Sequence, residues 1–130
     1  SSYLHPFSGH RVIGIGREDN KVKISLFDAS DAAKPTELAK YTLDEYYSEA
    51  ISNHHAFLLD DKHKVFFLPG SQGGYVFSYG GNNLKLVKAV SGVKVERALY
   101  LNDYLYLLSP EKIVVLDEDA WETLKEFEMK

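Results

Sequence analysis

Two adjacent histidines, His54 and His55, are the residues whose type most directly suggests chemistry. Together with a carboxylate such as Glu49 or Asp60 they could ligate zinc, which binds imidazole nitrogen and carboxylate oxygen. Neighbouring side chains on a strand point to opposite faces, however, so the two rings cannot easily share one ion. We therefore expect His54 to hydrogen-bond backbone or a carboxylate, and the sequence predicts neither a metal site nor a cofactor. A zinc-stabilised module that uses His54 stays open as an alternative.

Two acidic stretches could suggest calcium: Asp28 with Asp31, and residues 117–119, which are Asp-Glu-Asp. A calcium loop of the EF-hand type needs oxygen ligands at alternating positions around a central glycine. Neither stretch contains that glycine, so we expect both to be solvated turns.

The segment that includes residues 45–54 carries carboxylates and aromatic rings that suit a sugar ligand. Glu45 and Glu49 are four residues apart. Glycosidase chemistry needs two carboxyls about 5–10 Å apart across the sugar, and sequence spacing does not establish that. Tyr46 and Tyr47 could stack on a sugar face or pack in a core. The candidate ligand-binding residues are Tyr46, Tyr47, Glu49 and His54, and no catalytic residue is predicted.

Composition places the chain among folded, strand-rich domains and excludes several functions. Of 130 residues, 45% are hydrophobic and 13% aromatic, a bias that favours strands. The formal net charge of −4 argues against a nucleic-acid partner, because nucleic-acid binders are normally basic. The absence of Cys removes disulfides and thiolate metal sites. No run approaches the ~18 apolar residues of a membrane span.

The last third of the chain contains four short apolar runs separated by turn residues. The runs are Arg97–Leu101, Tyr104–Leu108, Lys112–Leu116 and Thr123–Phe127. Asn-Asp, Ser-Pro and acidic residues lie between them, and these residue types favour tight reversals. Four antiparallel strands joined by short turns form one blade of a β-propeller.

Similar units precede this one. The stretch that begins at His55 aligns with the stretch that begins at Arg97, 42 residues later, and a propeller repeat has roughly 40–45 residues. A weaker first copy alternates apolar and polar residues over Lys21–Asp28. The sequence thus predicts an antiparallel all-β fold, a partial β-propeller of about three blades. Their approximate limits are 1–48, 49–91 and 92–130.

Three blades would leave the ends of the arc uncovered, since closed propellers have about four to eight blades. We expect those ends to be covered by the remaining blades of a longer protein or by symmetric copies of the chain. The apolar residues expected on the faces of the first and last blades are Val22, Ile24, Leu26, Leu105, Ile113 and Val115.

Two long stretches resemble the secreted or cell-surface proteins that have a C-terminal β-propeller domain, distant relatives of WD40 repeats. They are Lys23–Leu38, KISLFDASDAAKPTEL, and Tyr47–Asp60, YSEAISNHHAFLLD. The chain departs from that family at Asn53, where Asp is usual, and at His55, where Lys is usual. The resemblance implies the C-terminal part of a longer prokaryotic protein and an extracellular or cell-surface location. It brings no catalytic residues with it.

Residues and resemblance together favour a non-enzymatic module, an extracellular scaffold or recognition surface for a protein or glycan, with no biochemical activity assigned. The alternative is a glycan-active hydrolase with its site on the propeller loops. An enzyme needs convergent titratable groups in matched roles, whereas a binding module does not. Only Glu49 and His54 are candidates for such roles, so we expect binding rather than catalysis.

Overall fold

A computed structural model describes residues 3–7, 9–31, 33–46, 57–70, 73–118 and 120–128. Their strands form three antiparallel sheets of four strands, and the strands of each sheet follow one another in chain order. The predicted antiparallel all-β fold of about three blades is thereby confirmed. Within the described residues no α-helix occurs, and none could therefore cross a membrane.

The strand bounds define the three sheets. Sheet 1 comprises β1 (Tyr3–Phe7), β2 (Arg11–Glu18), β3 (Lys21–Asp28) and β4 (Thr36–Tyr46). Sheet 2 comprises β5 (Leu58–Asp60), β6 (Val65–Pro69), β7 (Gly73–Ser78) and β8 (Lys85–Ser91), with the short 3-10 turn η2 (Gly80–Asn82) between β7 and β8. Sheet 3 comprises β9 (Arg97–Leu101), β10 (Tyr104–Leu108), β11 (Lys112–Asp117) and β12 (Thr123–Glu128).

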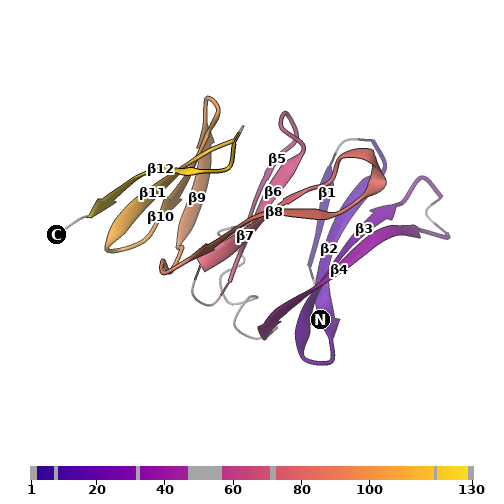
Figure 1. The fold of residues 1–130 in the computed structure, drawn as a ribbon. Helices are drawn as coiled ribbons and strands as arrows, with labels where there is room; N and C mark the ends of the chain where they lie inside the picture. Colours follow the sequence, from indigo (N-terminus) through magenta and orange to yellow (C-terminus); the bar gives the residue numbers. More distant parts are fainter. Residues whose placement is uncertain are drawn as a thin grey trace.

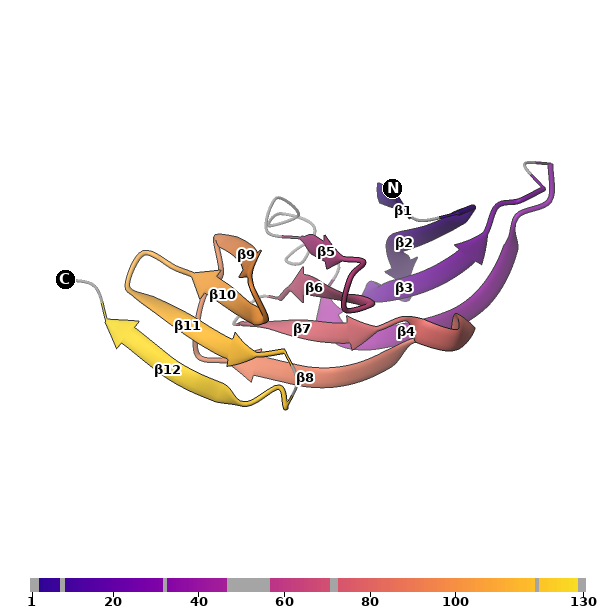
Figure 2. The same cartoon turned by 90° about the horizontal axis from the view of Figure 1, so that it is seen from above.

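The sheets stand face to face in a row, with sheet 2 between sheets 1 and 3 (Figure 1). Seen from above, the first strands β1, β5 and β9 lie on one side of the row and the last strands β4, β8 and β12 on the other (Figure 2). The first strands of sheets 2 and 3 are in contact. This is the arrangement of successive propeller blades, with first strands inward and last strands outward.

Burial along the strands follows from the position of each sheet. On β3, Val22, Ile24 and Leu26 are buried at alternating positions, as expected for a strand with one covered face. On β6 every residue is buried, because sheet 2 is covered on both faces. Its apolar run Val-Phe-Phe-Leu is what such a strand requires, since no position can face water.

The interface between sheets 1 and 2, called here the first interface, is rich in aromatic rings. Phe66 and Phe77 are cross-strand neighbours on sheet 2, and their rings stack with centroids 5.3 Å apart. Tyr41 of sheet 1 meets Phe77 edge-on at 5.1 Å. The fully buried aliphatic residues of this interface are Ile13, Ile15, Val22, Ile24, Leu26 and Leu68.

The interface between sheets 2 and 3, called here the second interface, is mainly aliphatic. The buried residues that form it are Val65, Phe67, Val76, Val93, Val95, Leu105, Leu107, Val114 and Leu116. Val93 and Val95 lie on the segment that crosses from β8 to β9, so the connection itself contributes to this core. Trp121, just before β12, packs against the same cluster.

Gly73 and Gly74 let two parts of sheet 2 approach closely. A Cβ on Gly74 would lie 2.2 Å from the Phe67 ring, and one on Gly73 would lie 1.8 Å from the Val90 carbonyl oxygen. Both distances are far inside van der Waals contact, so larger residues would displace Phe67 or the β7–β8 pairing. The glycines therefore allow Phe67 to lie across β7.

The structure adds two features to sheet 1 and corrects one expectation about the outward faces. The polar N-terminal segment contains a fourth strand, β1, which pairs with β2 along its length. β4 is the longest strand of this sheet and continues to Tyr46. The prediction that Val22, Ile24, Leu26 and Leu105 form outward faces is wrong, because the first three are buried in the first interface and Leu105 is buried in the second.

Candidate functional site

The four residues predicted to bind a ligand are only partly placed by the structure. Tyr46 ends β4, and its backbone pairs with Lys21. Tyr47, Glu49 and His54 lie outside the described residues, so their role stays a prediction. The structure instead brings together a group of charged residues that the sequence did not predict as a site.

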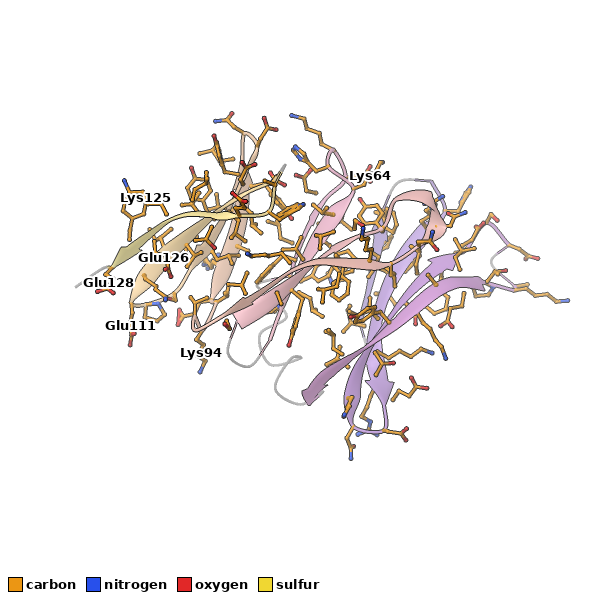
Figure 3. The ribbon with its side chains drawn as sticks, in the orientation of Figure 1. Lys64, Lys94, Glu111, Lys125, Glu126 and Glu128 are labelled. Atoms are coloured by element: carbon orange, nitrogen blue, oxygen red, sulfur yellow. The ribbon has the colours of Figure 1, made fainter. Side chains whose placement is uncertain are left out.

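This group, called here the carboxylate–histidine cluster, consists of Asp60, His63, Asp103 and Glu118. Asp60 ends β5, and His63 lies in the β5–β6 turn. Asp103 lies in the β9–β10 turn, and Glu118 directly follows β11. The cluster therefore joins sheet 2 to sheet 3 at one end of the second interface. Figure 3 marks this end of sheet 2 with Lys64, and Lys94 and Glu111 lie at the opposite end.

The His63 ring contacts three carboxyl groups. Its Nδ1 lies 2.6 Å from Asp60 Oδ2, and its Nε2 lies 2.9 Å from Asp103 Oδ1. A carboxylate can only accept, so the ring donates at both nitrogens when both bonds are made. Glu118 Oε2 lies 3.6 Å from Nδ1, within range of a charge interaction. The imidazole thus connects two carboxyl groups of sheet 3 to one of sheet 2.

Asp60 also organises the turn that carries His63. Its Oδ1 accepts hydrogen bonds from the backbone amides of Lys62 and His63, at 3.0 and 3.4 Å. Aspartate commonly stabilises turns in this way. Burial alone would raise the pKa of Asp60, but the hydrogen bonds from the His63 ring and amide lower it below its ordinary value.

Glu118 is the most unusual member of the cluster. Its side chain is 0% exposed, and neither carboxyl oxygen has a hydrogen-bond partner among the described residues. Its backbone amide donates to the Asp103 carbonyl at 3.0 Å, which holds the residue against the β9–β10 turn. Burial raises the pKa of Glu118 to about 7, the positive charge of His63 opposes that rise, and the negative charge of Asp60 adds to it.

Two neighbours complete the electrostatics. The hydrogen bond to Asp60 raises the pKa of His63, burial opposes the rise, and the bond to Asp103 adds to it. Tyr100 on β9 packs against the second interface, and its hydroxyl is buried without a hydrogen-bond partner among the described residues. Burial and then the Glu118 charge raise the pKa of Tyr100, so the phenol stays neutral.

The titratable groups of His63 and Glu118 are largely shielded from solvent. His63 is 17% exposed and Glu118 is closed to solvent, so a substrate cannot reach both groups. Acid–base chemistry requires the catalytic groups to contact the reacting atoms. The arrangement is suited to linking two sheets or to holding a cation.

Sequence reasoning missed this cluster for identifiable reasons. The expectation that residues 117–119 form a solvated turn is wrong for Glu118, which is buried between the β9–β10 turn and His63 of sheet 2. The partners come from two repeats, and His63 and Asp103 are 40 residues apart. The i,i+3 spacing of Asp60 and His63 at a predicted turn was the one local signal.

The outer faces of sheet 1 and sheet 3 each carry a pocket. A pocket of about 440 Å³ on sheet 1 is partly polar, and Lys23 and Glu37 pair across it at 3.3 Å. A pocket of about 390 Å³ on sheet 3 is lined by Tyr104, Tyr106, Val115, Leu124, Lys125 and Phe127. The Lys125 ammonium lies 4.7 Å from the centre of the Phe127 ring.

Comparisons with known proteins agree with the architecture. The family model described as "Beta propeller domain" matches residues 1–121. An uncharacterized protein of Archaeoglobus fulgidus is 54% identical over 130 residues, which are all of this chain and 21% of that protein. Uncharacterized protein MJ1554 of Methanocaldococcus jannaschii is 43% identical over 132 residues, again covering all of this chain and 21% of that protein.

A solved structure, the AfRom2 CNH domain, is also similar, with a TM-score of 0.41 and 9% sequence identity; the match covers 100% of this chain and 55% of that one. The chain spans about a fifth of the length of the curated relatives it matches. The match of the family model to nearly the whole chain, together with relatives this similar, places the sequence within one family. The chain belongs to the beta propeller domain family.

Proposed function

We propose that the protein is a non-enzymatic binding module of a larger β-propeller, a scaffold or recognition surface at the cell exterior. The proposal rests on the positions of the titratable residues and of the exposed apolar side chains. The titratable residues that converge in the described part of the chain are enclosed at the second interface. Exposed apolar side chains gather instead on the outer face of sheet 3. The extracellular location rests on the resemblance of Lys23–Leu38 and Tyr47–Asp60 to secreted propeller proteins.

The outer face of sheet 3 has the character of an interface. Ala98, Leu105 and Leu107 face the second interface, so the residues at alternating positions face outward. The large apolar residues exposed on sheet 3 are Leu99, Leu101, Tyr104, Leu124 and Phe127. Patches of this kind on a protein surface mark contact sites. The pocket among Tyr104, Leu124 and Phe127 lies within this face.

We propose that a further blade of the same polypeptide packs against this face. Sheets 1 to 3 already bury apolar faces against one another in the same manner. Closed propellers need about four to eight blades, and the relatives are about five times longer than this chain. The outer face of sheet 1 is more polar, with Lys23, Ser25 and Glu37 around its pocket, so its neighbour should supply polar groups.

The ligand of the module is proposed to be a protein or a glycan. Tyr46, Tyr47, Glu49 and His54 follow one another at the passage from sheet 1 to sheet 2. Aromatic faces and a single carboxylate suit the apolar face and hydroxyls of a sugar or the side chains of a peptide. Binding at this passage would need no convergent acid–base pair.

One experiment tests the covered face. In the full-length protein, Leu124→Glu should lower the free energy of unfolding by about 1.5–3 kcal/mol if a blade covers the face, because a charge then replaces buried apolar area. Glu122→Gln, on the exposed turn before β12, is the matched control and should change it by less than about 0.5 kcal/mol. A Leu124→Glu variant as stable as the control would contradict the proposal. An oligomer that this change converts to monomer would identify a second copy as the occupant instead.

A second experiment separates binding from catalysis. The full-length protein is measured against defined glycan and peptide panels, for both binding and turnover, with Tyr47→Ala and Glu49→Gln as variants. We expect saturable binding that Tyr47→Ala weakens, and no turnover. Turnover that Glu49→Gln abolishes would establish the hydrolase alternative.

A further inference from the structure

Three ligand atoms in the carboxylate–histidine cluster converge on one point. The nearest oxygens of Asp60 and Glu118 and a nitrogen of His63 all lie within 4.8 Å of one another. Zinc bound at about 2.0–2.2 Å in tetrahedral geometry places its ligand atoms roughly 3.4 Å apart. The 3.6 Å between His63 Nδ1 and Glu118 Oε2 already fits that separation. Asp60 Oδ2, at 2.6 Å from Nδ1, would need to swing away to make room for an ion.

Asp103 sets the His63 ring in the form that a metal requires. Its Oδ1 lies 2.9 Å from Nε2 and would keep the ring hydrogen there when an ion replaces the hydrogen on Nδ1. The lone pair of Nδ1 then points toward Asp60 and Glu118. A carboxylate that holds the second nitrogen of a ligating histidine is the usual outer partner at metal sites. Lys62, 3.8 Å from Asp103, balances the charge of that outer carboxylate.

Glu118 is the independent sign of a missing ligand. A buried carboxyl normally receives hydrogen bonds or pairs with a cation. Both oxygens of Glu118 lack a hydrogen-bond partner among the described residues, and the cation near Oε2 is the His63 ring at 3.6 Å, which carries a charge only when it is protonated. A divalent ion between Glu118 and Asp60 would satisfy both carboxylates and bring the local charge of these ligands to zero.

We propose that Asp60, His63 and Glu118 bind a divalent transition-metal ion of the zinc class, and that Asp103 orients the histidine. The donor set of one imidazole nitrogen and two carboxylate oxygens suits such ions. It does not suit Ca²⁺, which takes about six to eight oxygen ligands. Asp60 and His63 belong to sheet 2 and Glu118 to sheet 3, so the ion would fasten the two blades together. The site goes beyond the proposed binding role, because it acts on the module itself.

The test is metal binding by the chelator-treated full-length protein. Titration with Zn²⁺ should reveal one more bound equivalent in the wild type than in His63→Gln, and the extra equivalent should raise the melting temperature. His10→Gln, which removes an exposed histidine elsewhere, is the matched control and should retain that equivalent. Co²⁺ at the same site should show the visible absorption of a tetrahedral complex. Equal Zn²⁺ binding by the wild type and His63→Gln would overturn the proposal, and so would a preference for Ca²⁺.

Two further variants separate an ion from a simple ion-pair network. Glu118→Gln keeps the shape of the side chain and removes its charge, so the metal-free protein should be no less stable, while Zn²⁺ affinity falls roughly 100-fold or more. Asp103→Asn lies on an exposed turn and should weaken Zn²⁺ by about 10–100-fold, as expected of a positioning residue. If Glu118→Gln does not fold, Asp103→Asn carries the test. Zn²⁺ affinity unchanged in Asp103→Asn would contradict the proposed orientation of His63.

Discussion

The two interfaces of the row are built from the same strand pattern but are stabilised by different interactions. The first interface joins sheets 1 and 2 through rings such as Phe66, Phe77 and Tyr41. The second joins sheets 2 and 3 through aliphatic side chains and ends in the carboxylate–histidine cluster. The first should depend little on solution conditions. The second contains a charge balance that protons or a cation can change.

The neighbours Asp60 and Asp61 show how one turn serves both interfaces. Asp60 contacts His63 toward sheet 3. Asp61 accepts a hydrogen bond at 2.7 Å from the hydroxyl of Tyr79, whose ring lies in the first interface. A phenol is neutral at ordinary pH, whereas an imidazole is not always so. The difference between the two interfaces therefore begins at adjacent residues of one turn.

The largest effect is expected from removing a ring of the first interface. Phe66→Ala should cost about 3–5 kcal/mol of unfolding free energy, since it leaves a cavity where a 0% exposed side chain contacts Phe77 and Tyr79. Denaturant unfolding of the full-length protein, with and without chelator, measures it. The loss should be the same in both conditions. Leu107→Ala is the equivalent change in the second interface. We expect the unfolding free energy that it removes to vary with added Zn²⁺.

A smaller effect should appear when the pH of the chelator-treated protein is raised. The folded state raises the pKa of Glu118 from 4.5 to about 7 and raises that of His63 above 6.5. Both groups hold protons more tightly when folded, so their stabilisation is complete below the unfolded values and is lost as pH rises through the folded ones. The free energy of unfolding should therefore fall between about pH 5 and 8, by an amount on the order of 2 kcal/mol, and the melting temperature should fall with it. Glu118→Gln should flatten the profile, and a slope unchanged in that variant would assign it to other groups.

Tyr79→Phe should have a modest effect. It removes the hydroxyl that donates to Asp61, but Lys64 still lies 3.2 Å from the same oxygen. The acceptor keeps a partner, so the cost should be about 0.5–1.5 kcal/mol. Thermal unfolding at pH 6 and pH 8 measures it, and the loss should be equal at the two values. A loss that grew with pH would mean that the first interface also depends on charge.

The smallest effect should come from an ion pair at the edge of sheet 3. Lys112 Nζ and Glu126 Oε1 are 3.0 Å apart, and the Glu126 side chain is about half exposed. Exposed pairs of this kind contribute about 0–1 kcal/mol, so Lys112→Met should change the unfolding free energy by less than about 0.5 kcal/mol. Its profile against salt concentration should match that of the wild type. A larger loss would show that charge matters in sheet 3 even without burial.

The fold could be predicted because its signals are local. Alternation along Lys21–Asp28, turn residues such as Asn102-Asp103 and the 42-residue repeat all lie within short windows of sequence. Asn102 has a φ of +57°, which is the backbone that such a turn demands. β1 escaped prediction because His5 and Pro6 interrupt its apolar pattern, and its pairing with β2 comes from tertiary context.

The site could not be predicted from short stretches of sequence, because the residues of the carboxylate–histidine cluster come from two different repeats. Glu118 has the same sequence context as a solvated acidic turn, and its contacts come from the β9–β10 turn and from His63 of sheet 2. His63 stands between two lysines and looks like an exposed turn residue. Its carboxyl partners on sheet 3, Asp103 and Glu118, lie in the next repeat. Such a cluster is visible only once the interface between repeats is known.

Each sheet is made from one unbroken stretch of chain, and this has a consequence for the order of events during synthesis. A ribosome that releases the chain from its N-terminus delivers sheet 1 whole before β5 has been made, and domains generally fold in that order. The inner face of sheet 1, with Ile24 at its centre, must then wait for β6 and β7. The second interface closes later still. A chain halted before residue 118 would present Asp60 and His63 without their buried partner, so of the two interfaces the one that depends on charge is completed second.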